Sequence, residues 1–373
     1  SQRQTEFFDN NFGREIKWDI PLLDGYEYEF VENTSKKPGN KSFWGIKCPA
    51  LIPRILKYSP THILIFGWNF RAHFKVMRYF KGRIPVLFRG DSTLLDYNIQ
   101  SLQDLFKFPI IQILSSSIPQ LLKFQARKLS LSFIYRYINK ALYVGTNNKA
   151  YFLKHGLKET QLCFVPHAVD NSRFFDGPEK DYTKKAFQWR RELGISDTDF
   201  VILFAGKFET KKAPLLLLEA FNRITEKQAS VRLIFIGNGP MEEMLKEKAE
   251  NNPAVIFLPF QNQSVMPVTY RLANLFCLPS GGPGETWGLA VNESIACGVP
   301  VITSNKVGCS PDLVKSPPCY QFQSGNVEDL SRVLKTAIAK ISNNPHKDWN
   351  SFINKWSYEM LTGNLLKVLG DEI

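Results

Sequence analysis

Short runs of apolar residues recur through the second half of the chain, separated by longer segments whose apolar residues follow helical spacing. The runs are almost continuously apolar, which is typical of parallel strands covered by helices on both faces. We therefore expect a parallel sheet of the Rossmann type with a helix after each strand. The expected strands lie at 200–206, 231–237, 254–258, 274–279 and 299–303.

The first half contains a looser form of the same alternation. A polar stretch at 171–199, typical of a linker that leads into a first helix, separates the two halves. The expected fold class is α/β, with two Rossmann-like domains whose parallel sheets face each other across a cleft. We expect these domains at 1–172 and 173–345, followed by a helical segment, 346–373, that crosses back to the first domain.

The start of the chain departs from this pattern. Tyr26, Tyr28 and Phe30 alternate with acidic residues after Asp24-Gly25, which predicts a hairpin with a tight turn at that pair. A Rossmann-like half normally opens with a buried strand and a glycine turn into a helix, and the first 30 residues hold no such unit. We therefore expect the first domain to lack its first strand–helix unit, about 30 residues long.

Composition indicates a soluble globular protein, with 44% apolar and 22% charged residues. The six cysteines show no C-x-x-C spacing, which favours free thiols in a reducing compartment. No apolar run of about 18 residues predicts a membrane span, and the polar N-terminal segment has no signal-peptide pattern. These features predict a cytoplasmic location.

Positive charge is concentrated in one region of this chain of net charge +12, because nine Lys and Arg but no carboxylate lie between Asp104 and Glu159. Within it, residues 118–140 have the pattern of a basic amphipathic helix. This pattern suits an anionic membrane surface, and so predicts peripheral attachment at the inner membrane face. A solvated basic face is the alternative, and we expect no nucleic-acid partner.

Glycines, cations and an aromatic residue follow the expected strands at their carboxyl ends, where parallel sheets bind ligands. Two lysines after one strand suit a polyphosphate, a glycine turn lets the backbone approach a ligand, and an aromatic ring suits a flat base. The candidate binding residues from this pattern are Gly206, Lys207, Lys212, Gly237, Asn238, Phe260 and Gln261.

Two carboxylates, Glu285 and Glu293, lie eight residues apart, the second on a helix that we expect to begin near Trp287. A carboxylate can accept hydrogen bonds from adjacent hydroxyls, as on a ribose or a sugar ring. The backbone amides near Gly288 and Leu289, at the start of that helix, suit a phosphate. Acceptors for diols, cations for a diphosphate and a surface for a base together predict a nucleotide-sugar site.

These residues stand in motifs that resemble those of the retaining glycosyltransferases of family 4, which have the GT-B fold. The resemblance is close over 200–315, with "GKFETKK", "GNGP", "PFQNQ" and "ETWGLAVNESIACGVPVI" in family order, and looser over about 60–175. It implies an enzyme that transfers a sugar from a nucleotide-sugar donor to a saccharide or lipid-linked acceptor with retention of configuration. It implies no cofactor and no metal.

The resemblance also implies roles for individual residues. Lys207 and Lys212 would hold the departing diphosphate, Glu285 would contact the transferred sugar, and Glu293 would bind the ribose. The family typically has Arg where Lys207 stands, so the bidentate fork of Arg is lost here. It often has a histidine on the acceptor side, where this chain has Arg89 and Asp91 in "FRGDS".

Two other functions remain open from the residues. A sugar-nucleotide epimerase of the same fold would turn over the donor without an acceptor. A non-catalytic basic protein would bind anionic polymers with a steep salt dependence and would ignore nucleotide sugars.

Three further features favour structural roles. Asp197-Thr198-Asp199 resembles a metal-binding motif of another transferase fold but precedes a strand, so we expect a turn. His167 is expected to make a structural contact near the domain boundary. For Trp287, stacking on a sugar and packing under the loop remain equal alternatives.

Overall fold

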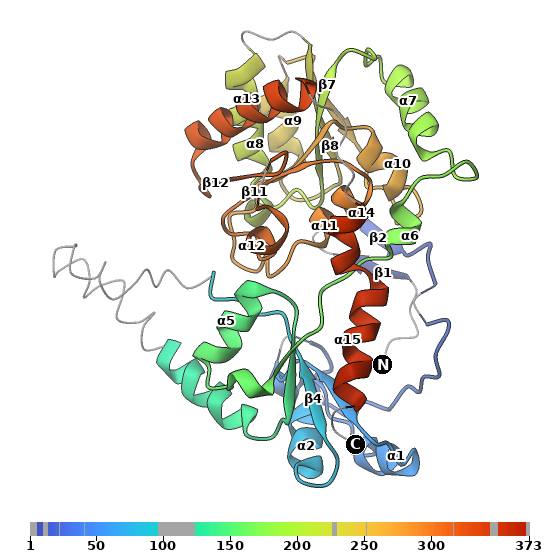
Figure 1. Ribbon diagram of the computed structural model, residues 1–373, viewed down its shortest axis with the longest axis vertical. Helices are drawn as coiled ribbons and strands as arrows, with labels where there is room; N and C mark the ends of the chain where they lie inside the picture. The colour runs from blue at the N-terminus through green and yellow to red at the C-terminus, as the bar shows by residue number, and fades with distance from the viewer. Residues whose placement is uncertain are drawn as a thin grey trace, which may run out of the picture. The chain divides into compact units, whose positions relative to one another are not determined.

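The computed structural model describes residues 6–9, 14–21, 23–40, 42–95, 124–225, 230–250, 252–315, 317–343 and 350–370. The chain forms two compact units (Figure 1). The first comprises residues 25–165 and the chain from Thr362 onward, and the second comprises residues 4–24 and 166–361.

The first unit is built on a parallel four-stranded sheet with the order β3-β4-β5-β6. Its core packs apolar strand residues such as Val86 and Phe88 against Met77 and Phe80 of a helix and Leu131 of another. The strands are β3 (Ile63–Phe66), β4 (Val86–Arg89), β5 (Lys140–Tyr143) and β6 (Leu162–Phe164). The helices are η1 (Phe43–Gly45), α1 (Leu51–Lys57), α2 (Arg71–Phe80), a helix over residues 124–135, α5 (Thr146–Lys154) and η2 (Glu159–Gln161).

The second unit is built on a parallel six-stranded sheet with the order β12-β11-β10-β7-β8-β9. Its central strand, β7, is buried along almost its whole length, as its continuous apolar run predicts. The five predicted strands of this half are confirmed, with ends that differ by one or two residues. They are β7 (Phe200–Ala205), β8 (Val231–Ile236), β9 (Val255–Leu258), β10 (Leu275–Leu278) and β11 (Val301–Ser304). A sixth strand, β12 (Tyr320–Phe322), was not predicted.

Helices cover both faces of this sheet, and α13 packs beside α8 over one of them (Figure 1). The longer helices are α7 (Tyr182–Glu192), α8 (Pro214–Thr225), α9 (Glu242–Ala249), α11 (Leu289–Ala296), α13 (Val327–Asn343) and α15 (Tyr358–Gly370). The shorter ones are α6 (Asn171–Phe174), η3 (Thr210–Lys212), α10 (Met266–Arg271), α12 (Ser310–Leu313), α14 (Asn350–Ile353) and η4 (Asn354–Trp356).

The boundary of the second unit differs from the predicted start at residue 173. Residues 166–172 fold with it because Val169 forms a backbone bridge with Ser357, and the Asn171 amide donates to the Ile353 carbonyl at 3.2 Å. The stretch predicted as a linker leading into a helix contains the short helix α6 and then the expected helix, α7.

The predicted hairpin around Asp24-Gly25 is wrong. The antiparallel pair lies earlier, where β1 (Glu6–Asp9) pairs with β2 (Arg14–Lys17), and it belongs to the second unit. The described residues of 23–40 form no strand, and Tyr26, Tyr28 and Phe30 are all exposed. Their alternation with acidic residues therefore does not mark one face of a sheet; the three rings contact one another edge to face.

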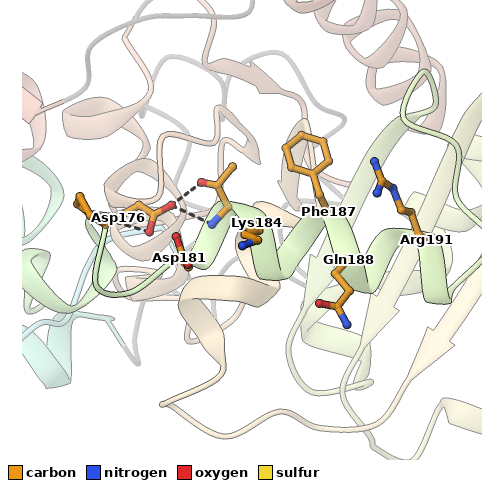
Figure 2. Close-up of a pocket in the computed structure, with 9 residues that line it drawn as sticks. Asp176, Asp181, Lys184, Phe187, Gln188 and Arg191 are labelled. Carbon is orange, nitrogen blue, oxygen red and sulfur yellow. Dashed lines mark hydrogen bonds between the residues drawn. The ribbon is translucent and has the colours of Figure 1, made fainter.

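The start of α7 is held by Asp176 (Figure 2). Its carboxylate accepts hydrogen bonds from the amides of Tyr182 and Thr183 at 2.9 and 2.8 Å, and from the Thr183 hydroxyl at 2.5 Å. Burial opposes the charge, but the bonds from Thr183, Tyr182 and Gly177 outweigh it and lower the pKa of Asp176 to about 2. These residues and the exposed Phe187 line an open pocket of about 970 Å³ along α7, which contains none of the predicted site residues.

No helix among the described ranges is both long and apolar enough to cross a bilayer.

We expect Asp176→Ala to lower the free energy of unfolding by about 1 kcal/mol, the usual cost of losing a helix-capping side chain. Because the folded pKa is depressed, this contribution is present above the ordinary pKa of Asp and is lost as the pH falls toward about 2. Denaturant titration at neutral pH measures the difference. Asp181→Ala is the control, since the side chain of Asp181 makes no cap bond, and equal losses in the two variants would contradict the role of Asp176.

Candidate functional site

The strand order of the second sheet reverses between β7 and β10. The chain runs outward from β7 to β8 and β9 on one side, and from β10 to β11 and β12 on the other. In open α/β sheets, ligands bind at such a reversal, beside the carboxyl ends of the strands. The loops after β7 and β10 meet here, because the Gly281 amide donates to the Lys211 carbonyl at 2.8 Å.

Lys212 and Glu285 form an ion pair across this junction. The Lys212 Nζ lies 2.5 Å from the Glu285 Oε2, and the two side chains are only 20% and 10% exposed. The Ser280 hydroxyl donates to the same carboxylate oxygen at 2.9 Å. Partly buried charges are screened less than surface charges, so Glu285 holds the ammonium group firmly at the reversal point.

The predicted glycine turn after β8 packs against the loop after β7. A Cβ atom at Gly237 would lie 2.0 Å from the carbonyl oxygen of Gly206, and one at Gly239 would lie 2.6 Å from that of Phe208. The Phe208 amide also donates to the Asn238 carbonyl at 3.0 Å. Both glycines are thus required by the contact between the two backbones.

Asn238 fixes the loop after β9. Its side-chain oxygen accepts from the Phe260 amide at 3.0 Å, while its side-chain nitrogen donates to Glu242 at 2.9 Å. The Gln261 side chain donates to the Pro259 carbonyl at 3.0 Å, within the same loop. The residues predicted from the ends of β8 and β9 therefore lie on connected loops, with Lys207 on the adjacent loop after β7.

The loop that carries Glu285 is held by a second loop, after β11. The amides of Gly308 and Cys309 donate to the carbonyls of Glu285 and Trp287 at 3.0 and 2.9 Å. A Cβ atom at Gly308 would lie 1.7 Å from the Thr286 carbonyl oxygen, so only glycine allows this approach.

Helix α11 begins at Leu289, after Gly288 in the left-handed conformation with a φ of 96°. The prediction placed this start near Trp287. No acceptor for the amides of Leu289 and Ala290 is present in the part of the chain that the structure describes. They are the unpaired donors of a helix N-terminus, and the macrodipole favours an anion beside them.

Glu293 lies on α11 and is bound by a residue that the sequence did not point to. The buried Tyr270 hydroxyl donates to Glu293 Oε2 at 2.7 Å. Burial raises the pKa of Glu293, and the bond from Tyr270 and the positive charge of Arg173 only partly offset this effect. Burial and the charge of Glu293 also raise the pKa of Tyr270 well above its ordinary value, so the phenol stays a donor.

Trp287 packs under the loop. It is 3% exposed, its Nε1 donates to the Asn292 side chain at 2.8 Å, and its ring lies 5.1 Å from that of Trp356. The His167 ring lies 5.6 Å from the Trp287 ring, and the His167 carbonyl accepts from the Asn292 side chain, which is the structural contact expected of His167.

The Asp197-Thr198-Asp199 segment forms the expected turn, and Asp199 is paired with Arg232 at 2.9 Å. Within the described ranges, no group of three His, Cys, Asp or Glu side chains is placed to hold a metal ion.

On the first unit, Arg89 is 8% exposed at the end of β4 and donates to the Val165 carbonyl at 2.9 Å. Burial lowers the pKa of Arg89, an effect that the charge of Asp91 partly offsets. The guanidinium thus connects β4 to the chain that leaves β6, and an acceptor role for Arg89 and Asp91 stays a prediction.

Residues 185–355 match the family model of the glycosyl transferases group 1. Solved structures with the same fold include Anabaena HepE in complex with UDP, with a TM-score of 0.63 and 15% identity over 87% of this chain and 82% of that one. Sucrose-phosphate synthase from Thermosynechococcus elongatus has a TM-score of 0.59 and 18% identity over 87% and 77%. The chain has the GT-B fold. The predicted α/β class with two parallel sheets is confirmed.

Curated relatives of the chain are glycosyltransferases. A Corynebacterium glutamicum relative, named GDP-mannose-dependent monoacylated alpha-(1-6)-phosphatidylinositol monomannoside mannosyltransferase, is 25% identical over 56% of each chain. The alpha-monoglucosyldiacylglycerol synthase of Streptococcus pneumoniae is 30% identical over 49% of this chain and 41% of its own. The match to such relatives spans about half of their length or less.

We expect Tyr270→Phe to raise the pKa of Glu293 further, because the variant loses the hydrogen bond that stabilises the charged carboxylate. When the pKa of a carboxyl group is higher in the folded protein than in the unfolded chain, the protein loses stability as the pH rises from the unfolded pKa through the folded pKa. Unfolding free energies of the wild type should therefore fall through Glu293 as the pH rises above the ordinary pKa of Glu, and fall more in Tyr270→Phe.

Glu293→Gln is the control, because it removes the titrating group. Adding Tyr270→Phe to Glu293→Gln should leave the pH dependence unchanged. A larger pH dependence in that double variant would contradict the assignment.

Proposed function

We propose that the protein is a retaining glycosyltransferase that takes a sugar from a nucleotide-sugar donor, held on the second unit, and transfers it to a saccharide or lipid-linked acceptor. The observation that carries this proposal is the Lys212–Glu285 ion pair at the strand-order reversal. A cation for a diphosphate and an acceptor for sugar hydroxyls lie in direct contact there, and Glu293 follows on the helix whose first amides are unpaired.

Each group has a distinct task in this reaction. Lys207, Lys212 and the first amides of α11 stabilise the negative charge that develops on the diphosphate as its bond to the anomeric carbon breaks. Glu285 accepts hydrogen bonds from the transferred sugar, and Glu293 from the ribose. The acceptor hydroxyl attacks from the face that the diphosphate leaves, and its proton passes to a diphosphate oxygen, which gives retention without a protein nucleophile.

Lys212 must exchange one anionic partner for another when the donor binds. Its bond to Glu285 competes with the diphosphate in the unliganded protein, whereas in the complex Glu285 turns to the sugar. The ion pair therefore holds the ammonium group ready before the donor arrives, at the expense of some affinity for a nucleotide that lacks a sugar.

We expect Glu285→Gln to raise the affinity for a free nucleoside diphosphate by about two- to fivefold, the scale of a partly exposed ion pair, while transfer falls sharply. Glu293→Gln should weaken the binding of the same nucleotide by about 1–3 kcal/mol, because the variant loses a charged hydrogen bond to the ribose. After a thermal-shift screen has identified the preferred donor, calorimetry measures both affinities. Weaker binding in Glu285→Gln, with no change in Glu293→Gln, would overturn the roles.

A lipid-linked acceptor is favoured by the described part of the basic stretch, residues 124–140; residues 118–123 lie outside the described ranges. Leu129 and Phe133 are 73% and 48% exposed on one helix face, and Arg136 is exposed close by. Exposed apolar residues beside cations suit an anionic bilayer surface. Arg127 does not belong to this face, because its Nε donates to the Tyr151 hydroxyl at 3.0 Å.

We expect the protein to co-sediment with vesicles of mixed phosphatidylglycerol and phosphatidylcholine at low salt. Binding should fall by about thirtyfold in Lys128→Gln/Arg136→Gln, since each basic residue near the surface contributes about 1 kcal/mol. Lys184→Gln/Lys248→Gln removes the same charge from the second unit and is the control. Equal losses in the two double variants would leave only a general charge effect, which contradicts a specific membrane face.

A further inference from the structure

The N-terminal segment folds with the second unit, although the first unit follows it in sequence. Directly after β2, residues 17–19, here called the strap, lie on the loop that follows β9. That loop, residues 259–264, carries Phe260, the aromatic residue predicted to contact the base of the nucleotide.

Polar contacts fix the strap on both sides of Trp18. The Asn262 side chain donates to the Lys17 carbonyl at 2.6 Å. The Ser264 amide donates to the two carboxylate oxygens of Asp19 at 3.2 and 3.3 Å, and the Ser264 hydroxyl donates to one of them. Because a bond precedes and follows Trp18, its backbone is held in one place on the loop.

The indole of Trp18 meets the Phe260 ring edge to face, with the ring centroids 6.5 Å apart and the planes at 68°. The backbone of Phe260 is fixed by Asn238 from the end of β8. Trp18 therefore lies beside the carboxyl ends of β8 and β9 and remains half-buried. Two rings that meet at a steep angle form a corner, in which a third flat group can stack on one ring while its edge meets the other.

We propose that Trp18 is a base-recognition residue that forms, with Phe260, an aromatic corner for the nucleobase of the donor. The inference rests on the proposed function and adds to it a residue from outside the sheet that holds the donor. Stacking on an aromatic ring strengthens the binding of a base and scarcely depends on phosphate charge. Trp18 thus acts on the base, whereas Lys212 acts on the diphosphate.

The test compares wild type, Trp18→Ala and Trp18→Phe by calorimetry with UDP, GDP, ADP and inorganic pyrophosphate, which lacks a base. We expect Trp18→Ala to bind the preferred nucleoside diphosphate about tenfold more weakly, with pyrophosphate unchanged. Trp18→Phe should retain most of the affinity. Trp44→Ala, which removes an exposed indole from the first unit, is the matched control and should bind as the wild type does.

Asp19→Ala keeps the indole of Trp18 but removes the hydrogen bonds to Ser264. It should lower the affinity for the same nucleoside diphosphate by a smaller factor than Trp18→Ala does. Unchanged binding of every nucleoside diphosphate by Trp18→Ala would overturn the inference, as would an equal loss for pyrophosphate, which would indicate a general loss of structure. A wild type that binds none of the three nucleoside diphosphates would instead overturn the proposed function.

Discussion

The ion pair between Lys212 and Glu285 connects the two loops that leave β7 and β10, and the arrangement of the candidate site depends on it. Both strands are buried in the sheet, so their ends are fixed by the core. The loops beyond them are short of apolar residues and are held by polar contacts: the ion pair, the Gly281–Lys211 backbone bond and the Ser280 hydroxyl. A charged pair at this place also keeps a cation and a carboxylate hydrogen-bond acceptor within bonding distance of each other.

The remaining parts of the site are built around this pair by close backbone contacts. Gly237 and Gly239 let the loop after β8 touch the loop after β7, and Gly308 lets the loop after β11 support the chain between Glu285 and Trp287. Such contacts leave little freedom in the loops, which lowers the entropy that a ligand would otherwise have to remove. Tyr270 extends the same principle to Glu293 by holding one of its carboxylate oxygens.

Much of the second unit could be predicted from the sequence, because a parallel sheet covered on both faces leaves near-continuous apolar runs. The position of the candidate residues of the second unit on the loops after the strands could also be predicted, since these residues directly follow the apolar runs in sequence. The Tyr270–Glu293 bond could not be predicted, because no local pattern connects two residues on different helices. Gly308 could be noticed in the sequence only as a glycine near the end of a strand. The contact that requires it is with Thr286 on another loop, and no sequence pattern connects the two loops.

The N-terminal segment was the least predictable part. Tyr26, Tyr28 and Phe30 suggested a strand where the described residues form none. The preceding residues, 4–24, belong to the second unit, which they contact through residues about 245 positions away in sequence. No propensity or spacing argument reaches over that distance.

The central claim is that Lys212 serves the distal phosphate of a nucleotide, and it is tested most directly by calorimetry of Lys212→Ala with a nucleoside diphosphate and the matching monophosphate. The account predicts a loss of about tenfold or more for the diphosphate and a much smaller loss for the monophosphate, because a charged contact to the distal phosphate is worth roughly 1.5–3 kcal/mol. Equal losses for the two nucleotides would contradict it.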